Sequence, residues 1–174
     1  MIFPLLITNT TPFCKSSHKK YYYSNVKRFL ASGFGIGLFW RTYFGDKKGG
    51  GTLAAFLFAL ITYVLNLNVL ELSILFIVLV LTYLVSVDDN DASEDPSWIT
   101  LDEIVGMSLV TIASPSRLLP LLAGFLVFRV SDIMKQPKFV AELEKYPGKL
   151  GVLYDDLGAD LMGLLSATVV NQII

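Results

Sequence analysis

The stretch TLAAFLFALITYVLNLNVLELSILFIVLVLTYLVSV, residues 52–87, is the most apolar part of the chain and contains one charged residue, Glu71. A polar break at residues 66–68 (Asn-Leu-Asn) divides it into arms of 14 and 19 residues, which as helices measure about 21 and 28 Å. The second arm, Val69–Val87, is long enough to cross a bilayer core of about 30 Å, whereas the first needs help from Gly49–Gly51. Apolar and polar residues do not alternate here as in a half-buried strand, so we expect two helices.

The composition of the whole chain also favours contact with lipid. Of its 174 residues, 53% are hydrophobic and 17% are charged, whereas soluble domains average roughly 45–50% apolar and about 25% charged residues. The single cysteine, Cys14, and the single histidine, His18, both precede the apolar arms. A single cysteine excludes a disulfide framework, and the position of these two residues argues against thiolate-based or histidine-based catalysis. We expect no nucleic-acid partner, and the oligomeric state stays open.

Three further helices are expected after the apolar arms. Asp95-Pro96 is a good start signal, because proline is tolerated at the first helical position, and this helix should run to about Ser114. A turn at residues 114–117 should lead into a helix from Leu118 to about Met134, and the last helix should run from near Asp155 to Ile174. The predicted fold class is therefore all-α: a helical membrane bundle of two helical hairpins plus a C-terminal helix. Residues 1–32 form a polar, basic N-terminal segment, and residues 33–174 form a single helical domain.

The distribution of charge predicts a topology. Eight of the 14 lysine and arginine residues precede the first apolar arm, which places that end in the cytoplasm by the positive-inside rule. If each apolar pair is a hairpin, the loops at 88–103 and 129–156 return to the same side. Alternatively, residues 104–128 form one span, but Pro115, Arg117 and Pro120 would then lie in mid-membrane, where charge and broken backbone are costly.

Polar clusters flank the apolar segments and contain the residues that can do chemistry. In a hairpin that turns near residues 115–116, Asp102 and Glu103 lie level with Arg129 and Asp132. Several carboxylates at one membrane face repel one another unless a cation holds them, and Mg²⁺ prefers such oxygen ligands. Arginine and lysine side chains can neutralise a transferring phosphate. The candidate phosphate-binding residues are Arg129, Lys135 and Lys149.

Taken in order, these clusters resemble the sequence blocks of the phosphatidylglycerophosphatase A family. The family's Asp-Pro-x-x-Ile-x-x-Asp-Glu-x-x-Gly block is similar to Asp95–Gly106, and its Phe-Arg-x-x-Asp-x-x-Lys block is similar to Phe128–Lys135. Its Gly-x-Gly-x-x-x-Asp-Asp pattern matches Lys149–Asp156 in part, since Lys149 replaces the first glycine. The glycine-rich stretches Gly33–Gly37 and Gly51–Ala55 are similar too. The resemblance covers roughly residues 33–167.

This resemblance implies an enzyme that hydrolyses phosphatidylglycerophosphate to phosphatidylglycerol with Mg²⁺. It further implies a multi-pass protein of the inner (cytoplasmic) membrane whose active site lies on the cytoplasmic side. The metal ligands carried over by position are Asp102, Glu103, Asp155 and Asp156. The candidate catalytic residues are Asp102, Asp132 and Arg129.

Two departures from the family pattern are present. Lys47–Gly51 replaces the usual Pro-Gly-Thr-Trp-Gly, and Asp160 follows Ala159 where the family usually has glycine. Two other functions were weighed. A CDP-alcohol phosphotransferase would need a long Asp-x₂-Asp-Gly-x₂-Ala-Arg pattern that is absent. A non-catalytic helical membrane protein that binds anionic lipid or a partner would suit the basic N-terminus but leaves the carboxylates unexplained.

Overall fold

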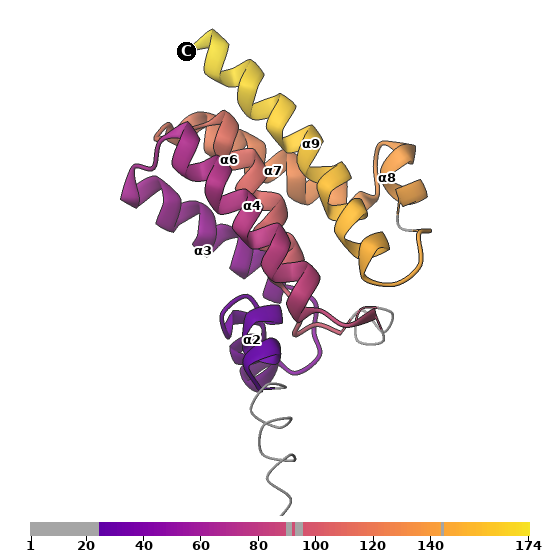
Figure 1. The fold of residues 1–174 in the computed structure, drawn as a ribbon. Helices are drawn as coiled ribbons and strands as arrows, with labels where there is room; N and C mark the ends of the chain where they lie inside the picture. Colours follow the sequence, from indigo (N-terminus) through magenta and orange to yellow (C-terminus); the bar gives the residue numbers. More distant parts are fainter. Residues whose placement is uncertain (1–24, 90–91, 93–95, 144) are drawn as a thin grey trace, which may run out of the picture.

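The computed structural model describes residues 25–89, 92, 96–143 and 145–174. Cys14, His18, the first 24 residues and Asp95 lie outside the described residues. Within these ranges the chain is helical and has no strand, so the all-α prediction is confirmed (Figure 1). The helices are α2 (Ile36–Phe44), α3 (Gly50–Leu65), α4 (Val69–Ser86), α6 (Leu101–Ala113), α7 (Leu118–Met134), α8 (Lys138–Leu143) and α9 (Lys149–Ile173). Residues 25–31 are also helical, and Ala31 and Ser32 are buried.

The apolar stretch forms two helices that separate at the predicted break. Helix α3 ends at Leu65, and Asn66 adopts the left-handed conformation (φ 54°) that ends many helices. Asn68 and Glu71 then form a capping box: the Asn68 side chain accepts from the Glu71 N–H at 3.1 Å, and the Glu71 carboxylate accepts from the Asn68 N–H at 2.9 Å. The one charge in the apolar stretch therefore starts helix α4.

Two predicted helix starts are wrong, while the turn between α6 and α7 is confirmed. Helix α6 begins at Leu101, because Pro96–Ile99 close a turn in which the Ile99 N–H donates to the Pro96 carbonyl at 3.0 Å. Helix α9 begins at Lys149, directly after Gly148 (φ 68°), six residues before the predicted start at Asp155. Helix α7 spans Leu118–Met134 as expected, and α8 was not predicted.

The helices do not pack as two separate hairpins. Helices α3 and α4 both pack mainly against α6, and α9 packs along α7 and α6, with α8 beside it (Figure 1). Glycines allow α7 and α9 to approach: a Cβ on Gly163 would lie 2.7 Å from the Gly124 carbonyl oxygen, and one on Gly124 would lie 3.0 Å from the Gly163 oxygen. Helices α6 and α9 are thus the centre of the bundle.

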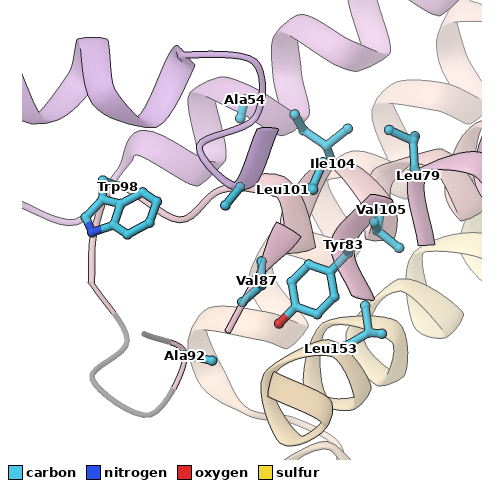
Figure 2. Packing of buried hydrophobic residues seen from close by; sticks show 11 residues of the cluster. Ala54, Leu79, Tyr83, Val87, Ala92, Trp98, Leu101, Ile104, Val105 and Leu153 are labelled. Carbon is cyan, nitrogen blue, oxygen red and sulfur yellow. The ribbon is translucent and has the colours of Figure 1, made fainter. Parts of the chain in front are cut away.

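A buried tyrosine joins the start of α9 to α4. Figure 2 shows Tyr83 among Val87, Val105 and Leu153, and its hydroxyl donates to the Lys149 carbonyl at 2.9 Å. Buried tyrosines usually find such a partner. This contact fixes the first turn of α9 against the end of α4, and with it the acidic residues of the next two turns.

One helix in the described part of the chain, α4, is long and apolar enough to cross a membrane. Its 18 residues have a mean hydropathy of 2.5, and 22% of them are buried. Helix α3 is apolar but shorter. Large apolar side chains are also exposed on other helices, including Ile61 on α3, Leu126 on α7 and Leu165 on α9. Of the several membrane spans that were predicted, the described residues therefore support one, helix α4.

Candidate active site

A chain of ion pairs connects three helices that are distant in sequence. The Arg129 guanidinium on α7 lies 3.4 Å from Glu103 on α6 and 2.9 Å from Asp132, one turn along its own helix. Lys135, just after α7, lies 3.4 Å from Asp132 and also pairs with Asp155 on α9. The predicted facing of Glu103 and Arg129 is confirmed, and the acidic pairs of α6 and α9 meet at one end of the bundle.

The tightest group of carboxylates comes from the end of α7 and the second turn of α9. One carboxylate oxygen each from Asp132, Asp155 and Asp156 lies within 4.8 Å of the others, and the two α9 residues are 5% and 6% exposed. This spacing suits a small cation with hard oxygen ligands. The sequence had placed Asp132 among the catalytic residues, whereas the structure places it beside the predicted metal ligands Asp155 and Asp156.

Asp102 and Glu103 approach this group from the first turn of α6. Asp102 is 6% exposed, and its Oδ1 accepts the Glu103 N–H at 3.0 Å. Glu103 pairs with Arg129, yet its Oε2 is buried and has no hydrogen-bond partner in the part of the chain that the structure describes. An unpartnered buried carboxylate oxygen is costly without a cation, so the donor set fits a divalent metal ion.

The electrostatics of the site show how strongly it concentrates negative charge. Burial, followed by the charges of Asp102 and Asp132, raises the pKa of Asp156 well above its ordinary value. Burial and the Asp102 charge raise the pKa of Glu103 to about 8, although Arg129 acts in the opposite direction. Burial lowers the pKa of Lys135, but its hydrogen bond to Asp155 and the nearby carboxylates outweigh this effect and raise it. The site therefore favours cations and protons.

Sequence reasoning missed the contribution of α3. Thr52, in the first turn of this helix, accepts a 2.8 Å hydrogen bond from Arg129 through its hydroxyl. A Cβ on the preceding Gly51 would overlap the Glu103 carboxylate. The glycines in the first turn of α3 therefore let this helix approach α6, and the Gly-Gly-Thr sequence at the start of an apolar helix was the available signal.

The structure does not bring Lys149 into this group. Its ammonium donates to the carbonyls of Leu84 at 2.8 Å and Val87 at 3.2 Å, where cations stabilise a helix C-terminus. Its N–H donates to Asp89 at 3.1 Å. We therefore replace the predicted phosphate-binding role with a structural one, because the side chain is committed to the end of α4.

Asp160 lies one turn after Asp156 on α9 and is fully buried. Neither of its carboxylate oxygens has a hydrogen-bond partner among the described residues. Burial and the Asp132 charge raise its pKa well above the ordinary value, while Arg129 opposes them. A Cβ on Gly106 of α6 would overlap Asp160 Oδ2 and would lie 2.8 Å from Oδ1. Gly106 thus makes the space that Asp160 occupies.

Comparisons with known proteins agree with this site. The sequence profile of the family phosphatidylglycerophosphatase A matches residues 29–171. A protein of Bacteroides thetaiotaomicron, provisionally named a phosphatidylinositol-3-phosphatase, is 27% identical over 152 residues, which cover 83% of this chain and 93% of that protein. No solved structure matches the chain significantly. Because the family profile covers most of the chain and includes every acidic residue of the site, the chain belongs to the phosphatidylglycerophosphatase A family of lipid phosphatases.

Proposed function

We propose that this protein hydrolyses phosphatidylglycerophosphate to phosphatidylglycerol and phosphate in a Mg²⁺-dependent reaction. The observation that carries the proposal is the group of Asp132, Asp155 and Asp156 within 4.8 Å, directly beside the cations of Arg129 and Lys135. Such a site can hold a metal ion and attract a phosphate at the same place. Family membership supplies the reaction class.

Each residue of the site has a defined task in this proposal. Asp132, Asp155 and Asp156 would hold Mg²⁺, which when bound would supply Lewis-acid polarisation of the phosphoryl group and help to activate water. Asp102 adds negative charge beside them. Arg129, held by Glu103 and Asp132, presents a planar fork of donors to the phosphate oxygens. Water attacks the phosphorus, the bond to the lipid oxygen breaks, and the lipid leaves as an alcohol.

Two lipid phosphates are candidate substrates. Phosphatidylglycerophosphate comes from the family description. Phosphatidylinositol 3-phosphate comes from the name of the Bacteroides relative. Both are phosphate monoesters on a lipid headgroup, and the same cations and carboxylates would serve either one. We place phosphatidylglycerophosphate first because the chain belongs to the family described by that activity, whereas the second candidate rests on the name of one relative at 27% identity.

We also propose that the protein lies in the inner (cytoplasmic) membrane with the site on the cytoplasmic face. The apolar α4 helix and the exposed apolar side chains of α3, α7 and α9 support contact with lipid. Polar and charged residues concentrate at the end of the bundle that carries the acidic site. Lipid headgroups would then reach the site without leaving the membrane surface.

Phosphate release from purified protein in detergent tests the substrate assignment. The substrates are phosphatidylglycerophosphate, phosphatidylinositol 3-phosphate, phosphatidic acid and a water-soluble phosphate monoester, each with Mg²⁺ or EDTA. We expect Mg²⁺-dependent release that is fastest for phosphatidylglycerophosphate. Faster release from phosphatidylinositol 3-phosphate would select the second substrate. Binding to anionic vesicles without release from any substrate would instead support the non-catalytic lipid-binding alternative.

A further inference from the structure

Asp160 is a carboxylate for which the site described above has no use. It is fully buried, and within the described ranges neither of its oxygens has a hydrogen-bond partner. It faces α6 at Gly106, whose missing side chain leaves the space for it. A carboxylate in this position cannot be solvated, and a buried unpaired polar group is costly. Its burial between two helices therefore indicates that the carboxylate is either held by a bound cation or protonated.

The charges around Asp160 show what kind of partner is needed. Among the described residues, six carboxylates gather here beside two cationic side chains, Arg129 and Lys135, so full ionisation of all six would leave an excess of four negative charges. The carboxylates are Asp102, Glu103, Asp132, Asp155, Asp156 and Asp160. One divalent cation would balance half of the excess, and two would balance all of it.

The group of Asp132, Asp155 and Asp156 does not include Asp160, although Asp156 lies one turn before it on the same helix. Residues at i and i+4 share a helix face, so these two side chains point toward the same space beside α6. In two-metal phosphatases the ions lie about 3.5–4 Å apart and stabilise the attacking and leaving oxygens together.

We propose that Asp160 and Asp156 hold a second divalent cation, next to the one held by Asp132, Asp155 and Asp156, so that Asp156 bridges the two ions. The proposal rests on the proposed function and deepens it, because it adds a second cation to the site that would carry out the reaction. Mg²⁺ typically takes one or two carboxylates together with water and phosphate oxygens, which two side chains satisfy.

The experiment counts cations bound to the full chain in detergent, with Mn²⁺ as a paramagnetic substitute for Mg²⁺. Electron paramagnetic resonance should show about two Mn²⁺ per chain and the magnetic coupling of a pair at this separation. Asp160→Asn and Asp160→Gly should each bind about one Mn²⁺ and give the spectrum of an isolated ion. Asp46→Asn is the matched control, since Asp46 is exposed and its described contacts are with Arg41 at 3.0 Å and with the Ser97 hydroxyl at 3.4 Å. This variant should bind Mn²⁺ as the wild type does.

The outcomes separate this inference from the proposed function. A single uncoupled Mn²⁺ in the wild type, with phosphate release intact, would overturn the second site and leave the proposed function standing. Unchanged binding in both Asp160 variants would also overturn it and would mean that Asp160 is buried in its protonated form. No bound Mn²⁺ at all would overturn both the second cation site and the metal ion of the proposed function. The wild-type spectrum decides the question even if a variant does not fold.

Discussion

Gly106→Ala tests the close packing that places Asp160 in the site. The new methyl group would overlap Asp160 Oδ2 and would lie 2.8 Å from Oδ1, and Asp160 is fully buried between the helices. Overpacking of this kind costs typically about 1–3 kcal/mol. Because the overlap is severe, we take the upper value of about 3 kcal/mol. The higher helix propensity of alanine offsets about 1 kcal/mol of this cost.

The net destabilisation is therefore about 2 kcal/mol, which is roughly a 30-fold change in the unfolding equilibrium. For a chain of this length, about 2–4 °C of melting temperature correspond to each kcal/mol, so Gly106→Ala should melt about 4–8 °C below the wild type. The assay is thermal unfolding in detergent, followed by circular dichroism, with EDTA present so that cation binding does not contribute.

The control is the same substitution in an Asp160→Ala background. Removing the carboxylate removes the overlap, so Gly106→Ala should there be neutral or raise the melting temperature. A drop that persists in the Asp160→Ala background would show that Gly106 serves some other contact. If Gly106→Ala in the wild-type background melts within about 1 °C of the wild type, less than the change expected for 1 kcal/mol, the described packing of α6 on α9 is refuted.

Arg129→Lys should lower kcat by about 10²-fold, because an ammonium cannot reproduce the planar guanidinium fork. The control Arg41→Lys, in the exposed ion pair with Asp46, should stay fully active. Equal activity of the two variants would contradict the phosphate-binding role of Arg129. Lys149→Met should lower the melting temperature, because it removes the hydrogen bonds at the end of α4. Its kcat should stay within about twofold of the wild type, because the groups that stabilise the transition state remain in place. A large loss of kcat in a well-folded variant would return Lys149 to the active site. Burial raises the pKa of Glu103 from 4.5 to about 8, so its protonated form stabilises the fold below pH 4.5 and this contribution is lost as the pH rises to about 8. The melting temperature in EDTA should therefore fall over that range, and Mg²⁺ should offset the fall. A melting temperature that rises with pH in EDTA would contradict the burial of this charge.

The boundaries that sequence reasoning located correctly are those set by local chemistry. Asn66 and Asn68 end one helix and start the next through their own backbone and side-chain preferences. The start of α6 was misplaced because Asp95-Pro96 is a strong local signal, whereas the observed start at Leu101 follows the Pro96–Ile99 turn and a distant contact. The Thr100 N–H donates to the carbonyl of Ala31 at 3.2 Å, and no local pattern predicts that bond.

The acidic residues of the site were predictable as a set, but their grouping was not. Helix periodicity placed Glu103 level with Arg129, and the structure confirms this pair. Which carboxylates share a cation site depends on how α9 is positioned, and this follows from Gly124 and Gly163 and from the hydrogen bond of Tyr83 to the α9 backbone. These contacts are long-range, so Asp132 was assigned to catalysis and not to the metal group.

The measurement that tests the central claim most directly is the Mg²⁺ dependence of phosphate release from phosphatidylglycerophosphate by the wild type and Asp156→Asn. Asp156 lies in the tightest carboxylate group and is almost completely buried, so its loss should weaken both metal binding and charge stabilisation. The wild type should release phosphate in Mg²⁺ and lose that activity in EDTA, and Asp156→Asn should be slower by about 10²-fold or more at saturating Mg²⁺. Equal release in Mg²⁺ and EDTA, or full activity of a folded Asp156→Asn, would contradict the account.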